Sequence, residues 1–182
     1  CFNDTGTTEI YTLSLEGALP SCRTHFTVSM GAQFGQDDNH FALAPNAPAD
    51  FDKLMSALPQ ERALKMIYGW ALSSENRTLT LDNVQSAQDV NFNALLFLAQ
   101  AIGSAGNSDP VELIVFSNNA QQIAGEAILH PEQALLAGPV RVIPNEFSHV
   151  SSRLVDVAVP QQGSWQEIGK HTSELQSRGH LV

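Results

Sequence analysis

Two tyrosines are the first residues to test for reduction chemistry, because a tyrosine hydroxyl can give a proton to a carbonyl oxygen as hydride arrives. That proton transfer needs a lysine four residues later in the chain, whose charge lowers the pKa of the tyrosine. Tyr11 is followed at this spacing by Leu15, and Tyr68 by Leu72. Neither tyrosine has the required partner, so we predict no catalytic residue here.

The first turn between a strand and a helix is the next place to look, because nucleotide-binding α/β folds need glycines there for the backbone to approach a pyrophosphate. Residues 4–9 contain one glycine, Gly6, and Glu9 puts a negative charge where a phosphate would lie. The simpler interpretation is a helix start capped by Thr7 or Thr8. We therefore predict no cofactor-binding residue in this chain.

Hydrolytic and metal-assisted chemistry also lack their motifs. The sequence has no Gly-x-Ser-x-Gly elbow, and Ser104 stands between Gly103 and Ala105 in an expected helix-ending loop. Asp37 and Asp38 are adjacent carboxylates in a polar loop, which is typical of a solvated pair. The histidines show no metal-ligand spacing, so no metal site is predicted. They are His25, His40, His130, His149, His171 and His180.

The remaining candidate is the polar run Ser117–Asn119, which follows the strongest strand pattern in the sequence. Parallel α/β folds place their working side chains at the carboxyl ends of strands. A polar turn after the strand explains the same residues without any chemistry. We therefore assign no catalytic role to them.

Composition narrows the class of protein. The chain has 182 residues, 43% of them hydrophobic and only 15% charged, with a net charge of -10. A charge of this sign repels nucleic acid and anionic lipid, so neither is an expected partner. The low charge content is consistent with a surface partly covered by another protein. The two cysteines form no disulfide framework, which favours a reducing, cytoplasmic location. Both chain ends lie in apparent strand material, so we expect the chain to be a piece of a longer polypeptide.

Hydrophobic periodicity predicts alternating strands and helices. The strands are expected at the tail of residues 1–6 and at 25–30, 65–72, 110–117 and 154–159, and the helices at 8–16, 50–58, 90–103 and 165–176. Polar loops are expected at 31–40 and 73–82. Residues 131–138 start as a helix, and residues 139–143 fit either a continued helix or a strand. This order predicts an α/β fold, a truncated Rossmann-like three-layer arrangement with a mainly parallel sheet flanked by helices on both faces.

Several segments, in this order, resemble the ketoreductase region of modular polyketide synthases. They are residues 28–34, 41–45, 50–54, 92–103, 131–146 and 152–157. The most specific is Pro131–Glu146, with its Gly138 and Arg141-Val142, followed by the closing Asp156. The match covers most of the chain, to about Val159, and depends on the order and spacing of several segments.

The resemblance implies a fold and a role. Such ketoreductases have two short-chain-dehydrogenase-like halves, and this chain is similar to the first, a truncated Rossmann-like subdomain without cofactor. In that family the second half holds NADPH and the catalytic Ser, Tyr, Lys and Asn. The resemblance also makes residues 131–143 helical, with Gly138 packing closely on the sheet, while Pro139 and Pro144 depart from the pattern.

These implications give the following expectations. Residues 1–160 form the structural subdomain, and residues 161–182 form a helix or linker towards the catalytic subdomain. The chain itself binds no cofactor and supports a partner half that reduces 3-ketoacyl thioesters on an acyl carrier protein, next to other synthase domains. Two alternatives stay open: an inactive ketoreductase remnant that braces a dehydratase or methyltransferase domain, and a free-standing α/β enzyme or small-molecule-binding protein.

Overall fold

A seven-stranded sheet lies at the centre of the computed structural model, which describes residues 13–16, 23–59, 63–73, 80–106, 108–122 and 127–157. Its strands are β1 (Leu13–Glu16), β2 (Arg23–Met30), β3 (Gly35–Asp37), β4 (His40–Leu43), β5 (Leu64–Tyr68), β6 (Val111–Asn118) and β7 (Val150–Val157). They are arranged in the order β3-β4-β2-β1-β5-β6-β7. The β5/β6, β6/β7 and β2/β4 pairs are parallel, whereas β1 runs antiparallel to both β2 and β5, and β3 to β4.

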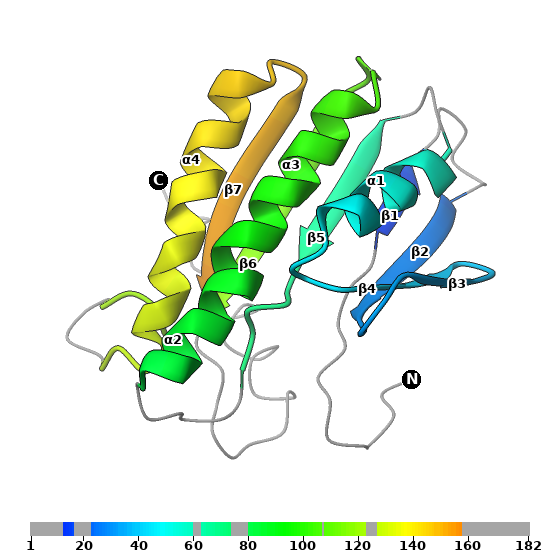
Figure 1. The fold of residues 1–182 in the computed structure, drawn as a ribbon. Coiled ribbons are helices and arrows are strands. Elements are labelled where there is room, and N and C mark those ends of the chain that lie inside the picture. The colour runs from blue at the N-terminus through cyan, green and yellow to red at the C-terminus, as the bar shows by residue number, and fades with distance from the viewer. Residues whose placement is uncertain are drawn as a thin grey trace, which may run out of the picture.

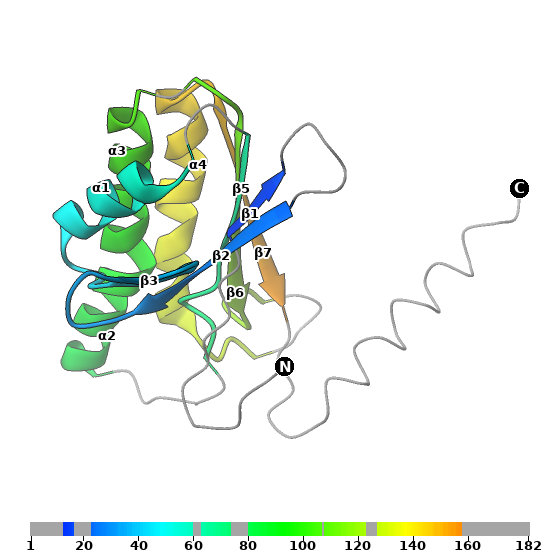
Figure 2. The same ribbon diagram turned by 90° about the vertical axis from the view of Figure 1, so that its right-hand side faces the viewer.

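The helices form a layer on one side of this sheet (Figures 1 and 2). They are α1 (Pro48–Ala57), α2 (Leu81–Gln88), the π-helical turn η1 (Asp89–Asn93), α3 (Ala94–Ser104), the 3-10 segment η2 (Pro131–Leu136) and α4 (Ala137–Glu146). Each parallel pair among β5, β6 and β7 is joined through helices of this layer, as in a βαβ unit. The α/β, Rossmann-like class predicted from the sequence is confirmed. Within the described residues the helices cover only one face, so the second helical layer of the expectation is not seen there.

The helix prediction for residues 8–16 is wrong where it can be compared, because Leu13–Glu16 is a strand paired with β2 and β5. These residues read Leu-Ser-Leu-Glu, and such alternation has the period of a strand. The loop predicted at residues 31–40 is also wrong in part, since it contains β3 and the start of β4. Both errors concern short antiparallel strands of three or four residues, over which periodicity gives little signal.

The core lies between the helices and the sheet. In β5, buried Leu64, Met66 and Tyr68 alternate with the partly exposed Lys65 and Ile67, which is the period of a strand with one covered face. Four other predicted elements agree with this layer: 50–57 lies in α1, 111–117 in β6, 154–157 in β7 and 90–103 in η1 and α3. The strand predicted at 65–72 ends at Tyr68, and α2 begins within the loop predicted at 73–82. Residues 158–182, including the predicted helix at 165–176, lie outside the described residues.

On the other face of the sheet at β5 to β7, three charged side chains lie among apolar ones such as Ile114 and Phe116 of β6. Glu112 accepts hydrogen bonds from two cations on the neighbouring strands, Lys65 Nζ at 3.1 Å and Arg153 Nη2 at 2.8 Å. All three side chains are more than one-third exposed, so such pairs stabilise the fold by about 1 kcal/mol or less each. They align the three parallel strands without providing a second core.

One long helix crosses the sheet as α2, η1 and α3, and its π turn is held by side chains from other elements. The Tyr68 hydroxyl donates to the Val90 carbonyl oxygen, and buried Asn91 donates through Nδ2 to the Glu132 carbonyl at 3.2 Å. A π turn inserts one extra residue into the helix and so rotates the side chains of α2, which precedes it, relative to those of α3. The residues of α2 are accordingly not buried.

The segment left open by periodicity, residues 139–143, is helical, as the resemblance implied. Pro139 is in the first turn of α4, where its missing N–H is tolerated. Pro144 lies within the helix and cannot donate to the Val140 carbonyl, but the Ser152 hydroxyl of β7 donates to that oxygen at 2.5 Å. The strand thus satisfies the helix carbonyl that Pro144 leaves unpaired.

The helix predicted at 90–103 should end at Gly103, whereas the structure places Gly103 inside α3 against Phe147. A Cβ at Gly103 would lie 2.3 Å from Phe147 Cε1, which no real contact allows. Gly138 was expected to pack closely on the sheet. It is instead exposed on α4, where a Cβ would meet Phe92 Cε2 at an ordinary 3.6 Å.

These two glycines predict opposite effects for one substitution. We expect Gly103→Ala to lower the free energy of unfolding by about 1–2 kcal/mol, because displacing the Phe147 ring outweighs the better helix propensity of alanine. Gly138→Ala is expected to raise it by about 0.5–1 kcal/mol through helix propensity alone. Urea denaturation measures both, and equal effects of the same sign would contradict the packing described here.

Candidate functional site

The carboxyl ends of β5, β6 and β7 form the edge where parallel α/β proteins bind their ligands. Ser117 and Asn118 lie there, at the end of β6, and Asn119 follows in the turn. The side chains of Ser117 and Asn118 are buried, with 0% and 1% exposure. Their role therefore depends on what they contact inside the protein.

Asn118 is the centre of a buried amide network. Its Nδ2 donates to the Ser73 carbonyl at 2.8 Å, and its Oδ1 accepts from the Ser73 N–H at 3.0 Å. Gln133, which is 1% exposed, donates through Nε2 to the Ala71 carbonyl at 2.7 Å and accepts through Oε1 from the Asn118 N–H at 2.8 Å. The network ties the turn after β5 and the start of η2 to the end of β6.

A carboxylate holds the next turn. Asp156 accepts from the Ser117 hydroxyl at 2.7 Å and from the backbone N–H groups of Ala120 and Gln121 at 3.2 Å each. Asn119 adopts the left-handed conformation, with φ of 50°, and its N–H donates to the Val157 carbonyl at 3.1 Å. Carboxylates and hydroxyls that fill one another's hydrogen-bonding capacity in this way serve structure.

The strand edge is therefore occupied by the chain's own side chains. Ser117, Asn118, Gln133 and Asp156 direct their polar atoms at one another and at the backbone. Cofactor sites at this position leave backbone N–H groups and open space for a phosphate. Here an anionic carboxylate takes the N–H groups after β6, and a phosphate would be repelled by it.

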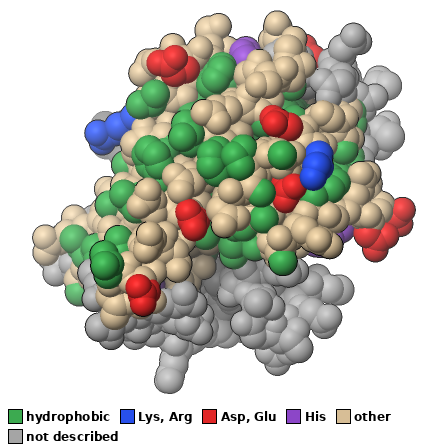
Figure 3. Space-filling model, viewed as in Figure 1, with side chains coloured by type: hydrophobic (Ala, Val, Ile, Leu, Met, Phe, Trp, Pro, Cys, Tyr) green, Lys and Arg blue, Asp and Glu red, His purple; other side chains and the backbone are tan. Residues whose placement is uncertain are grey.

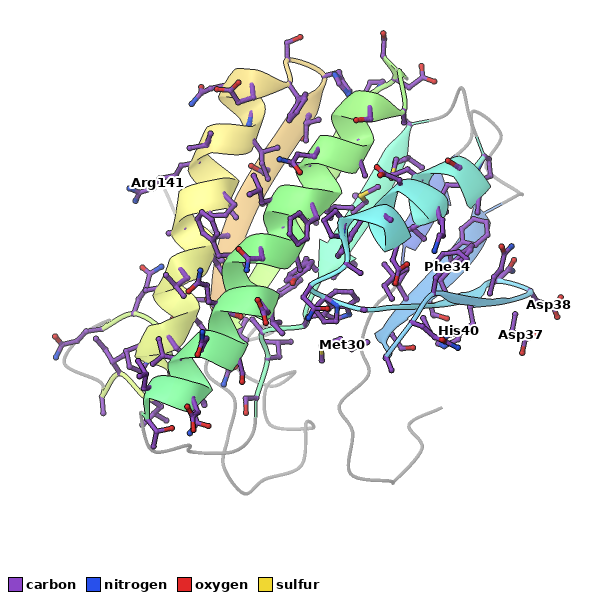
Figure 4. The ribbon with its side chains drawn as sticks, viewed as in Figure 1. Met30, Phe34, Asp37, Asp38, His40 and Arg141 are labelled. Carbon is purple, nitrogen blue, oxygen red and sulfur yellow. The ribbon has the colours of Figure 1, made fainter. Side chains whose placement is uncertain are left out.

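The other candidate residues are dispersed. Tyr68 is buried and donates its hydroxyl to the Val90 carbonyl, and Ser104 is exposed at the end of α3. Asp37 and Asp38 are exposed at the tip of the β3–β4 hairpin (Figure 4). They are thus the solvated pair that the sequence predicted.

The described histidines also lie apart. His40 has its two ring nitrogens near hydroxyls of β2, at 2.9 and 3.1 Å, and buried His130 lies 3.3 Å from Glu132. His149 is at the opposite, amino-terminal end of β7. In the part of the chain that the structure describes, no three His, Cys, Asp or Glu residues are grouped as metal ligands would be. Residues 4–9, Tyr11, His171, His180 and the side chain of His25 lie outside the described set.

Sequence reasoning missed two residues of the strand edge, Gln133 and Asp156. In the sequence, Gln133 was noted only as part of the segment Pro131–Glu146. Residues three positions apart lie on the same side of a helical turn, so the position of Gln133 relative to buried Leu136 indicates that its amide faces inwards. Asp156 was noted as the closing acid of the resemblance. Its place in the predicted strand 154–159, whose other residues are apolar, was the signal that it has a partner.

Solved structures with a similar fold come from synthase assembly lines. One is described as the adenylation, ketoreductase and pseudo Asub multidomain structure of a keto acid-selecting NRPS module, with a TM-score of 0.69, 21% identity and 86% of this chain covered. Another is an N-terminal ketoreductase from the macrolactin assembly line, with a TM-score of 0.52, 14% identity and 82% covered. The chain spans only 13% and 30% of the length of these two chains.

Fold and strand edge together define a Rossmann-like α/β domain of the type found in ketoreductase structures, which confirms the resemblance. The chain belongs to the family described as beta-ketoacyl synthase-like, N-terminal, whose model matches residues 6–172. No curated protein sequence matches it. Among the described residues, no helix has the length and apolar character needed to cross a membrane.

Proposed function

We propose that this chain is the non-catalytic structural half of a polyketide synthase ketoreductase, working in the cytoplasm. It supports a catalytic half that reduces 3-ketoacyl thioesters on an acyl carrier protein with NADPH. Its other partners are neighbouring domains of the same synthase. Two similar structures support this assignment, because one is an NRPS module that includes a ketoreductase and the other is an N-terminal ketoreductase from an assembly line.

The observation that carries the proposal is the filled strand edge. The N–H groups of Ala120 and Gln121 are bound by Asp156, and the Gln133 and Asn118 amides bond to each other and to the turn after β5. A domain that bound dinucleotide at this edge would have to break these bonds and place phosphates beside Asp156. A sheet kept for support has no such conflict, so the hydride donor and the proton donor come from the partner half.

The test compares the isolated chain with the parent polypeptide. NADPH is titrated into each, with cofactor fluorescence as the binding signal, and a 3-ketoacyl thioester is then added to measure NADPH oxidation. We expect the isolated chain to give neither saturable binding nor turnover, while the parent polypeptide gives both. Stoichiometric NADPH binding or turnover by the isolated chain would overturn the proposal, as would a parent polypeptide without reductase activity.

A further inference from the structure

One histidine at the β3–β4 end of the sheet lies between two hydroxyl groups. His40, in β4, has Nδ1 at 2.9 Å from Thr27 Oγ1 and Nε2 at 3.1 Å from Ser29 Oγ, both on the neighbouring strand β2. Thr27 and His40 are exposed, whereas Ser29 is only 6% exposed. A hydroxyl within hydrogen-bonding distance of an imidazole, which is itself held by a third group, is the arrangement that activates nucleophiles.

The hydrogen-bond network decides which ring nitrogen of His40 carries the proton. The Ser29 hydroxyl donates to the Phe41 carbonyl oxygen at 3.4 Å, so its oxygen accepts a hydrogen bond from the Nε2–H of His40. Nδ1 then has its lone pair available, and the Thr27 hydroxyl donates to it. His40 is therefore placed to take the proton of Thr27, and Ser29 holds the ring in the orientation that this transfer needs.

Strand pairing brings these side chains together. Thr27 lies opposite His40 in the parallel pair of β2 and β4, and the Thr27 N–H donates to the Asn39 carbonyl at 2.9 Å. His40 lies opposite Asp37 in the antiparallel pair of β4 and β3. Side chains directly opposite one another in such a pair point to the same face, with Cβ atoms about 5 Å apart. Thr27, His40 and Asp37 therefore form one row across three strands, with a carboxylate next to the imidazole.

The row is open to solvent. Figure 4 shows His40 and Asp37 on the same side of the β3–β4 hairpin, and Figure 3 shows acidic side chains protruding at the tip of this hairpin. The charge of Asp37 favours the imidazolium that forms when His40 takes a proton, which is the role of the acid in a nucleophile–base–acid triad. Because Thr27 is exposed and Ser29 is buried, an acyl donor can reach the Thr27 hydroxyl but not that of Ser29.

We propose that Thr27 is a site of covalent acylation by acyl thioesters, with His40 as its general base. His40 Nδ1 takes the hydroxyl proton as Thr27 Oγ1 attacks the carbonyl carbon of the thioester. An ester bond forms, the carbon–sulfur bond breaks, and the leaving thiolate takes the proton from His40 and departs as a thiol. The inference uses only β2, β3 and β4, so it does not depend on the proposed function.

The test incubates the 182-residue chain with an acetyl thioester of a small thiol and locates the acetyl groups by peptide mass spectrometry. Hydroxylamine then removes acetyl esters from hydroxyls and leaves acetyl amides on lysines, so the two products are told apart. The exposed hydroxyls of Ser56 and Ser104 in the same molecules are the matched controls. We expect Thr27 to be acetylated at least about tenfold faster than either serine, because a positioned general base accelerates the attack.

Two variants separate the base from the hydroxyl. His40→Gln keeps an amide that can bond to both hydroxyls but has no basic nitrogen, so acetylation of Thr27 should fall about a hundredfold. Thr27→Val should lose the hydroxylamine-sensitive label on β2 altogether. Equal labelling of Thr27 in the wild type and in His40→Gln would overturn the inference, as would wild-type labelling no faster at Thr27 than at Ser56 and Ser104. The second comparison needs no variant, so it decides the question even if a substitution prevents folding.

Discussion

Replacing Gln133 with leucine is expected to lower the free energy of unfolding by about 2–5 kcal/mol. Leucine fills a similar volume but leaves the buried Asn118 N–H without an acceptor and the Ala71 carbonyl without a donor. Each buried polar group that loses its partner costs about 1–3 kcal/mol. Because Gln133 is 1% exposed, water cannot replace the amide at that position without opening the structure.

Chemical denaturation of the isolated chain measures this effect, with Gln85→Leu as the control. Gln85 is exposed on α2, so its loss should change stability by no more than about 0.5 kcal/mol. Similar small changes for both variants would show that the amide network does not hold the strand edge closed. That result would also remove the observation on which the proposed function depends.

Phe51→Ala is expected to lower the free energy of unfolding by about 3–5 kcal/mol, the usual cost of removing a buried aromatic ring. Phe51 is 2% exposed and contacts the rings of Trp70 and Phe97 at centroid distances of 6.2 and 6.1 Å. It also lines an apolar cavity of about 40 Å³ between α1 and the sheet. The substitution enlarges a space that the surrounding side chains already leave partly empty.

Phe34→Ala is the matched control, because Phe34 is only half-buried at the edge of the core and has Lys53 Nζ 5.2 Å from its ring centroid. It should cost much less than Phe51→Ala when both are measured by urea denaturation. The enlarged cavity is apolar, so benzene should raise the melting temperature of Phe51→Ala and leave that of Phe34→Ala unchanged. Equal costs, or no response to benzene, would show that the core closes around the lost ring.

Local sequence patterns predicted the elements whose contacts are themselves local. The i, i+3, i+4 spacing of α1 indicates one covered face, the apolar runs of β5 and β6 indicate buried strands, and the structure has these elements at those places. β1 was mistaken for a helix because its identity depends on pairing with the next strand, β2, on one side and with the distant strand β5 on the other. A strand in this position has no local signature beyond four alternating residues.

The same reason explains what was missed at the strand edge. The sequence placed Ser117–Asn119 correctly at the end of β6 but did not reveal that Gln133 and Asp156 reach them from other elements. Pro144 likewise departed from the expected helical pattern, because its compensation by the Ser152 hydroxyl comes from β7. Partners supplied through tertiary contacts decide whether a polar residue is free for chemistry, and one sequence does not show them.

The β3–β4 hairpin has a consequence for how this protein behaves in crowded solution. β3 is the outermost strand of the sheet, is three residues long, and ends at Asp37 beside Asp38. A short, negatively charged border offers few backbone groups to a strand from another molecule and repels an equally acidic one. We therefore expect this border of the sheet to resist pairing with a strand from another molecule.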